Sequence, residues 1–240
     1  MDTRKYMYQE LKSLFSRWFG EPPVPENART FLALLDNYPE FPLPAKGHHL
    51  TLSHEAAQRN LEAVMQAMPD RLAALESLCY AFSIDWPDQL SLNESRELIK
   101  AIHSWAGETW PHVYKDLPDD AEAQWFAGER AGEYKILSVI SDITLLLGTI
   151  IIHERPGIRW GIDDDQDNLK DRMGTPNRVV LLAPWMGDPE TLSPIDVEFV
   201  VLGRLVEGHY INERFENSWL RVVEGACVGG YEGVGVIDPP

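Results

Sequence analysis

The stretch Gly132–Asp163, GEYKILSVISDITLLLGTIIIHERPGIRWGID, contains the change of hydrophobic pattern that decides the fold class. Up to about Glu154 the apolar residues follow one another as in a long, largely buried helix. Beyond the Arg-Pro-Gly break, Ile158, Trp160 and Ile162 alternate with small or charged residues, which is the period of a half-buried strand. The stretch therefore predicts a helix that leads directly into a strand.

The most apolar part of this stretch, Ile143–Ile152, is too short to cross a membrane. It holds ten residues and is bounded by Asp142 and His153. A membrane-spanning helix needs about 20 apolar residues. We therefore expect a core helix and no membrane anchor.

Downstream of the stretch, the pattern predicts a second strand and a further helix. RVVLLAP, residues 178–184, is a continuous apolar strand, so residues 163–177 become the connection between two antiparallel strands. SPID, residues 193–196, has the residue types that cap a helix, with proline at the first helical position, and we expect this helix to reach about Glu224. The glycine-rich tail predicts one short edge strand at Val234–Ile237.

Upstream of the stretch, capping residues and proline-rich connections predict a series of helices. The expected helices run from Asp2 or Thr3 to about Gly20, from Asn27 to Leu35, from Ser53 to about Met68 and from Ser91 to about Gly107. Two further helices begin at Pro69 and at Asp119. The last one reaches Glu154. Its glycines, Gly128, Gly132 and Gly148, either interrupt the helix or permit close helix packing, and we favour packing.

Together these patterns predict a mainly helical α+β protein with a small antiparallel β-sheet in its C-terminal half. We expect a helical segment over residues 1–115. Residues 116–240 form an α+β segment, with a β-hairpin at about 157–184 and a C-terminal helix. The two segments are expected to pack as one compact unit.

The charge of the chain limits its partners. There are 38 acidic residues against 21 basic ones, a formal net charge of −17. This charge opposes binding to nucleic acid and to anionic membranes, and it favours fast capture of a basic partner. The two cysteines, Cys79 and Cys227, lie far apart in apolar surroundings, and the N-terminus lacks the apolar region of a signal peptide. Free thiols and a cytoplasmic location are the expectation.

The densest polar feature is the stretch WGIDDDQDN, residues 160–168. A calcium loop beginning at Asp163 would need glycine where Asn168 stands and glutamate where Gly174 stands, so calcium is disfavoured. Unpaired carboxylates are too costly to bury, and long connections are often functional. We therefore expect these acidic residues to face water or a cationic partner, and both alternatives stay open.

The candidate partner contacts lie in three places. The connection between the strands supplies Asp163, Asp164, Asp165, Asp167 and Asp171. The acid-rich region 116–133 supplies Asp116, Asp119 and Asp120. Trp185, together with Trp110, is a candidate aromatic anchor, because tryptophan is frequent among residues that dominate interfaces.

Recognisable catalytic and metal motifs are missing from the sequence. The histidines and the glutamate of GHHLTLSHE, residues 47–55, match no helical metal-ligand spacing, and the sequence has no GxSxG nucleophile motif. GGYEGVG, residues 229–235, lacks the lysine of a phosphate-binding loop. We expect no catalytic residue, cofactor or metal, although a hydrolase with two carboxylates distant in sequence stays open.

The order of elements across residues 119–224 carries a resemblance. A helix, a strand with Trp160 and Gly161 after Pro156, a second strand and a capped helix are similar to an arrangement in bacterial toxin-immunity proteins. They resemble in particular the immunity partners of type VI secretion effectors. The resemblance implies an acidic cytoplasmic protein without catalytic residues, which blocks a toxin by covering its active surface. It transfers no contact residue, because that class has no common contact motif.

Charge and resemblance lead to one functional hypothesis. The chain is expected to bind and occlude a cognate cationic toxin, of the nuclease type, delivered by a secretion system. The alternatives are a hydrolase with a dispersed carboxylate active site and an acidic adaptor protein.

Overall fold

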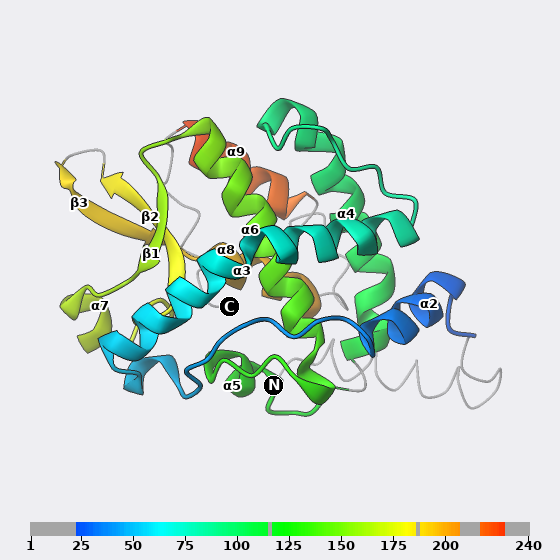
Figure 1. Cartoon of the computed structure of the whole chain (residues 1–240), viewed down its shortest axis with the longest axis horizontal. Helices are drawn as coiled ribbons and strands as arrows, with labels where there is room; N and C mark the ends of the chain where they lie inside the picture. The colour runs from blue at the N-terminus through cyan, green and yellow to red at the C-terminus, as the bar shows by residue number, and fades with distance from the viewer. Residues whose placement is uncertain (1–22, 115–116, 186–187, 207–216, 229–240) are drawn as a thin grey trace, which may run out of the picture.

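The computed structural model describes residues 23–114, 117–185, 188–206 and 217–228 (Figure 1). The elements are α2 (Glu26–Leu35), η1 (His49–Thr51), α3 (His54–Ala81), α4 (Leu92–Tyr114), α5 (Ala121–Phe126), η2 (Gly132–Tyr134), α6 (Ile136–Glu154), β1 (Arg159–Ile162), α7 (Gln166–Lys170), β2 (Val179–Trp185), β3 (Asp188–Ile195), α8 (Val197–Val206) and α9 (Ser218–Val228). The described chain is mainly helical, with its strands in the C-terminal half, so the predicted fold class is confirmed. The helix expected before Gly20 and the edge strand expected at residues 234–237 lie outside the described residues.

Helix α6 runs through the centre of the protein. It packs against α3, α4, α8 and α9. In the described part of the chain, residues 132–154 form the one segment long and apolar enough to cross a membrane, and 83% of its most apolar window is buried inside the protein. The expected core helix is therefore confirmed.

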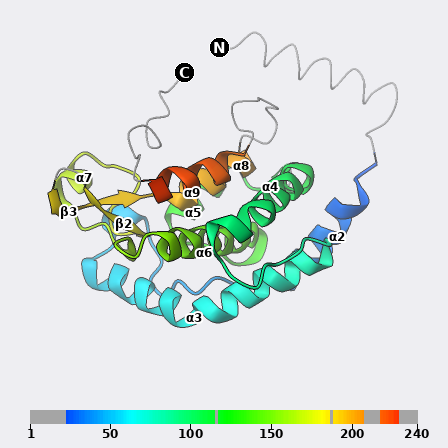
Figure 2. The ribbon, with the colours of Figure 1, turned by 90° about the horizontal axis from the view of Figure 1, so that it is seen from above.

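The helices lie in three layers (Figure 2). Helix α3 forms one outer layer, α4 and α6 lie in the middle, and α8 and α9 form the opposite layer, while the sheet closes one end. A single large hydrophobic cluster connects these layers and includes Phe31 of α2, Leu75 of α3, Ile102 of α4, Ile143 of α6 and Val201 of α8. The N-terminal helices and the C-terminal α+β region thus share one core.

The sheet is antiparallel with the order β1-β2-β3. Trp160 pairs with Leu181, and Leu181 pairs with Ile195. The strand β3 was not predicted, and Pro194 lies in it opposite Leu182 instead of beginning a helix. An edge strand tolerates proline because its outer side makes no ladder bonds.

Helix α8 begins later than predicted and ends earlier. The Asp196 side chain caps it by accepting a hydrogen bond from the Phe199 amide at 3.0 Å. The described helix stops at Val206, and α9 is separate, so the single helix expected to reach Glu224 is wrong.

The glycines of region 119–154 divide into two kinds. Gly128 and Gly132 have φ angles of 77° and 57°, and both lie between α5 and α6. They interrupt the single helix predicted from Asp119, because these angles are incompatible with a right-handed helix. Gly148 fits the packing interpretation, since a Cβ atom there would lie 2.2 Å from Cζ2 of Trp160.

Two predicted helix boundaries are absent. Helix α3 is continuous through Pro69, and α4 is continuous through Gly107 and Pro111. Proline at position 69 removes one backbone hydrogen bond on an exposed face of the helix. The helix continues because Val64 and Leu75, on either side, are buried in the core and stabilise it by packing. The predicted start of α4 is confirmed, because Ser91 Oγ accepts a hydrogen bond from the Glu94 amide at 3.3 Å.

Candidate functional site

The acidic connection between β1 and β2 is organised by a buried carboxylate. Asp163 is only 3% exposed. Its oxygens accept hydrogen bonds from Thr175 Oγ1 at 2.5 Å, Asn168 Nδ2 at 3.1 Å and the Asp165 amide at 3.2 Å. The expectation that Asp163 faces water or a partner is therefore wrong. Burial is tolerated because several donors replace the lost water.

The connection contains a short helix and is fastened to the rest of the protein. Asp165 is exposed and caps α7 by accepting a hydrogen bond from the Asp167 amide at 2.8 Å. Asn177 Nδ2 donates to the carbonyl of His49 at 3.0 Å, and His49 Nδ1 lies 3.0 Å from the carbonyl of Pro176. These contacts hold the connection against η1.

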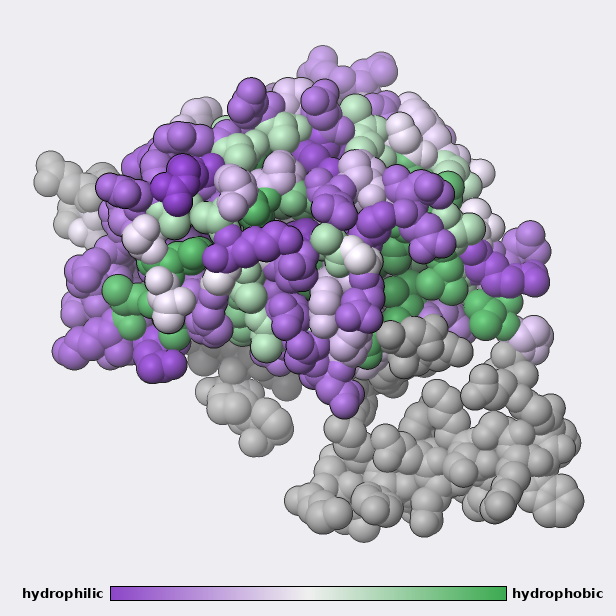
Figure 3. All heavy atoms as spheres, turned by 60° about the horizontal axis from the view of Figure 1, so that its bottom comes forward, coloured by the Kyte–Doolittle hydropathy of each residue, from purple (hydrophilic) through white to green (hydrophobic). Residues whose placement is uncertain are grey.

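Besides Asp165, which caps α7, three exposed carboxylates of the connection have no cation partner among the described residues. Asp164, Asp167 and Asp171 are exposed, and within the described residues none forms an ion pair, although Lys170 and Arg172 belong to the same segment. At the left end of the molecule in Figure 3, hydrophilic side chains predominate around a small hydrophobic patch. These three side chains are available to a partner.

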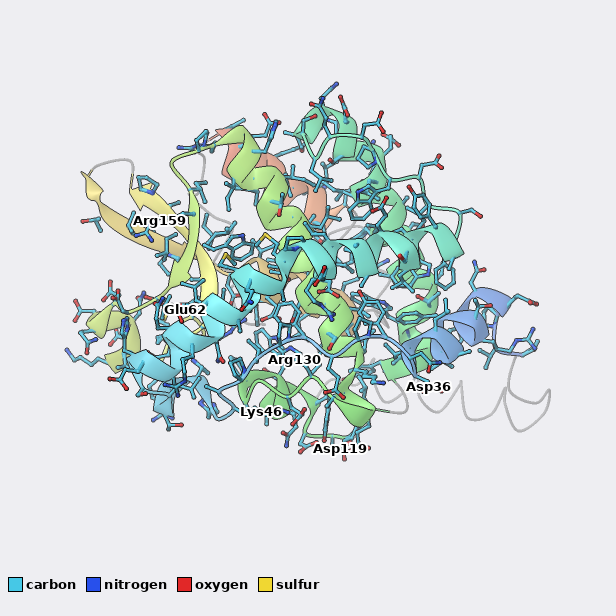
Figure 4. The ribbon with its side chains drawn as sticks, in the orientation of Figure 1. Asp36, Lys46, Glu62, Asp119, Arg130 and Arg159 are labelled. Atoms are coloured by element: carbon cyan, nitrogen blue, oxygen red, sulfur yellow. The ribbon has the colours of Figure 1, made fainter. Side chains whose placement is uncertain are left out.

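The acid-rich region around α5 lies beside the same framework. The ring of His49 stacks on Phe126 of α5, with centroids 4.8 Å apart, so η1 joins α5 to the connection. Asp119 is exposed near the edge of the molecule (Figure 4). Asp120 is also exposed, and hydrogen bonds from Gln124 and Tyr134 lower the pKa of its carboxyl.

Three candidate contacts remain: Asp116, Trp185 and Trp110. Asp116 and the side chain of Trp185 lie outside the described residues. Trp110, expected as an exposed aromatic anchor, has no exposed surface and packs between Trp105 and Trp219. That expectation is wrong because α4 continues past Gly107 and carries Trp110 into the core.

Behind the connection lies a buried cluster of charges that the sequence analysis did not identify. Glu198 of α8 accepts from Arg130 Nη2 at 3.1 Å and from Arg178 Nη2 at 2.9 Å. Arg178 also binds Asp196 at 2.5 Å, and its guanidinium lies 4.1 Å from the Trp125 ring centroid. The only sequence signal is an acidic residue inside an otherwise apolar helix segment, VEFVVLG.

Pairing with two arginines favours the ionised form of Glu198. Burial would raise the pKa of Glu198, but the charges of Arg130 and Arg178, with a hydrogen bond from Ser141, lower it to about 2. Burial raises the pKa of Asp196, against the opposing effect of Arg178. With two guanidinium groups and two carboxylates, the cluster is neutral overall. Its geometry suits a structural brace better than a general acid.

A small cavity adjoins the cluster. Its volume is about 60 Å³, and its walls include Arg130, Arg178, Glu198, Asn60 and Trp160. That volume holds a few water molecules, whereas sites for larger ligands measure about 300–1,000 Å³. The cavity therefore offers no room for a sizeable substrate.

The histidines and cysteines of the described part of the chain do not assemble into a metal site. No group of three or more histidine, cysteine, aspartate or glutamate side chains there is placed to hold a metal ion. His48 and His49 stack on each other with centroids 4.7 Å apart, and burial lowers the pKa of His49 to about 4. Cys79 and Cys227 are free thiols, as predicted.

No protein-family model matches the chain, and neither a curated protein nor a solved structure matches it. Its function is therefore inferred from its own residues.

Proposed function

We propose that this chain is a cytoplasmic immunity protein that binds and occludes a cationic, nuclease-type toxin delivered by a secretion system. It acts by covering the toxin and not by catalysing a reaction. The observation that carries the proposal is the set of exposed carboxylates Asp164, Asp167 and Asp171, which have no cation partner among the described residues.

The contrast between inner and outer carboxylates supports this proposal. Asp142, Asp196 and Glu198 are each paired with arginine inside the protein. The three outer carboxylates face solvent instead. In a chain with a net charge of −17, they add to a field that attracts a basic protein and accelerates association.

The rigidity of the connection also supports a binding role. Asp163 fixes its interior, Asp165 caps α7, and Asn177 ties it to η1. A surface that is already ordered loses less conformational entropy when it binds. The exposed carboxylates Asp119 and Asp120, next to α5, add to the negative charge of the protein surface.

The proposal is tested by neutralisation of a toxin. Each protein encoded beside this gene is expressed alone in a bacterial host, and then together with this chain. We expect one of them to arrest growth and this chain to restore it. If none is toxic, or if none of the toxic ones is neutralised, the immunity proposal is wrong.

The binding surface is tested by association kinetics with that toxin at several salt concentrations. The triple variant Asp164→Asn, Asp167→Asn, Asp171→Asn should associate more slowly and with a weaker salt dependence. The control is Asp70→Asn, Asp85→Asn, Asp88→Asn, which removes the same charge at exposed positions near α3. Equal rates for the two triple variants would exclude the connection as a contact.

The growth-rescue experiment also distinguishes the immunity protein from the other candidate functions. An acidic adaptor would present a similar surface but would not rescue growth. A hydrolase with a dispersed carboxylate site has less support, because the buried carboxylates Asp142, Asp196 and Glu198 are already engaged by arginine.

A further inference from the structure

The cavity beside the charge cluster is enclosed by segments that are far apart in the sequence. Its volume is about 60 Å³, and its wall includes residues of α3, α5, α6, α8, β1 and the segment between α7 and β2. Helix α3 packs on both α6 and β1, so these elements meet at the cavity. The Trp160 ring reaches the wall by packing on Gly148 of α6, where a Cβ atom would lie 2.2 Å from Cζ2. The core therefore fixes which side chains line this space.

Two indole N–H groups in the wall lack a hydrogen-bond acceptor. Nε1 of Trp125 and Nε1 of Trp160 are buried, and neither has an acceptor among the described residues. Trp125 is only 2% exposed. Most buried polar groups are hydrogen-bonded to protein or to ordered water, and leaving one unpaired is costly. Trp105, Trp110 and Trp219 also carry unpaired indole N–H groups, but these three rings do not line the cavity.

The wall also offers a hydrogen-bond acceptor, the Nε2 atom of His49. Nδ1 of this ring lies 3.0 Å from the carbonyl of Pro176. A carbonyl only accepts hydrogen bonds, so Nδ1 carries the hydrogen of the neutral ring. The ring is neutral at pH 7 because burial lowers the pKa of His49 to about 4. Nε2 is then an acceptor, and within the described chain no donor is bonded to it.

The charges in the wall are already balanced, which disfavours an ionic ligand. Glu198 accepts hydrogen bonds from Arg130, Arg178 and Ser141, and Arg178 is also paired with Asp196. An additional anion would meet the Glu198 carboxylate, and an additional cation would meet the two guanidinium groups. A neutral molecule avoids both repulsions and the cost of removing a further charge from water.

The size of the cavity restricts the ligand further. At about 10–15 Å³ for each water-sized group, a cavity of about 60 Å³ takes roughly four of them. Acetamide is of this size. Its carbonyl accepts hydrogen bonds and its amide nitrogen donates them, which matches the free groups of the wall.

We propose that this cavity is a binding site for a small neutral molecule that both accepts and donates hydrogen bonds, of the class of the primary amides. Its carbonyl oxygen accepts from the indole N–H groups of Trp125 and Trp160, and its N–H donates to Nε2 of His49. Its apolar part lies against Val64 and Leu145, which are buried in the same wall. The site is independent of the acidic surface and of the proposed toxin.

The test is a titration of the isotopically labelled full chain with acetamide, followed through the indole N–H signals in NMR spectra. Single Trp→Phe variants assign these signals. We expect the signals of Trp125 and Trp160 to shift saturably, while those of Trp105, Trp110 and Trp219 stay in place. Sodium acetate at the same concentration, similar in size but charged, should not produce these shifts.

Two variants and a matched control connect the binding to the wall. Trp160→Phe and His49→Phe each remove one proposed hydrogen bond, and each should weaken acetamide binding about 3- to 10-fold, measured on the Trp125 signal. His49→Phe keeps a ring that can stack on Phe126. The control Trp110→Phe removes an indole N–H that is equally unpaired but lies outside the cavity wall, and it should leave binding unchanged.

Several results would overturn the site. One is the absence of a saturable shift with acetamide, which is the outcome for a cavity that holds only water. Another is an equal shift with acetate. The third is an affinity that His49→Phe leaves unchanged, or a weakening that Trp110→Phe reproduces, because the effect would then not depend on the cavity. If Trp160→Phe fails to fold, His49→Phe and the acetate comparison still decide.

Discussion

Arg71 of α3 and Asp142 of α6 form a doubly hydrogen-bonded ion pair in the interior, with Nε–Oδ1 and Nη2–Oδ2 distances of 2.8 and 2.5 Å. The two side chains are 5% and 0% exposed. The Tyr38 hydroxyl donates to the same carboxylate at 2.6 Å, and Arg71 Nη1 donates to the carbonyls of Pro39 and Glu40. This group ties the proline-rich connection before α3 to two helices.

Removing one partner of this ion pair should destabilise the protein more than replacing both partners with apolar residues. Asp142→Ala leaves the guanidinium of Arg71 buried without its acceptor, and we expect a loss of about 3–5 kcal/mol in the free energy of unfolding. The double variant Arg71→Met, Asp142→Leu should lose less, because no charge stays buried. Urea denaturation measures both. A double variant as unstable as Asp142→Ala would contradict this explanation.

Glu198 should contribute stability that depends on pH. Its folded pKa, about 2, lies below the ordinary value of 4.5. The contribution is therefore complete above about pH 5 and is lost as the pH falls from there toward 2. The shift corresponds to a contribution on the order of 3 kcal/mol. The difference in unfolding free energy between the unmodified chain and Glu198→Gln should shrink accordingly on acidification.

The control for this pH dependence is Glu108→Gln, at an exposed position on α4. It should stay within about 0.5 kcal/mol of the unmodified chain at every pH. A constant difference for Glu198→Gln between pH 3 and 7 would show that its ion pairs with Arg130 and Arg178 do not determine its protonation.

Two helical glycines should respond oppositely to alanine. At Gly148 the added Cβ meets the Trp160 ring at 2.2 Å, so Gly148→Ala should destabilise the protein by about 1–3 kcal/mol. At Gly203 in α8 nothing lies within 4 Å, so Gly203→Ala should stabilise it by about 0.5–1 kcal/mol. Thermal and urea unfolding compare the two. Loss of stability in both variants would mean that helix packing around α8 is tighter than described.

Arg172 is held in a left-handed conformation at the end of α7. Its φ angle is 56°, and the Met173 amide closes the turn on the Asn168 carbonyl at 3.0 Å. A non-glycine residue costs about 1 kcal/mol in this region, so Arg172→Gly should raise the free energy of unfolding by about 0.5–1 kcal/mol. Lys170→Gly, inside α7, should lower it. If both variants destabilise, the Arg172 side chain makes a contact that outweighs its backbone cost.

Asp163 should behave as a structural residue and not as a surface charge. Asp163→Ala leaves the donors of Asn168 and Thr175 without an acceptor, and we expect a loss of about 1–3 kcal/mol with faster amide exchange across residues 163–177. The surface variants Asp164→Asn and Asp167→Asn should leave stability almost unchanged. Unaltered amide exchange in Asp163→Ala would show that another contact holds the connection.

Patterns that span a few residues predicted the elements well. Ser53 and Ser91 cap α3 and α4 because a capping side chain bonds to an amide three residues ahead. The alternation around Trp160 predicted β1, and the apolar run Ile143–Ile152 predicted the core helix. The sequence neighbourhood of Pro194 fits a helix start, whereas pairing with Leu182 places this residue in an edge strand.

Partners distant in sequence explain what could not be predicted. Gly128 and Gly148 lie in the same sequence segment and look alike there. Glycine is required at position 148 because the Trp160 ring approaches its backbone, and only the tertiary structure shows this contact. Arg130 meets Glu198 across 68 positions of the chain, and Arg71 meets Asp142 across 71. No local pattern encodes such pairs.

The sequence by itself determined the helical character, the central apolar helix, the first two strands and the large negative charge, because each follows from composition or from spacing within a few residues. Only the tertiary structure decided which charged side chains are buried inside the protein and which face solvent. It buried Asp163, left Asp164, Asp167 and Asp171 in solvent, and packed the Arg204 side chain against the backbone of Gly107. The physical reason is that the cost of a charge depends on the water and partners around it, and packing alone decides both.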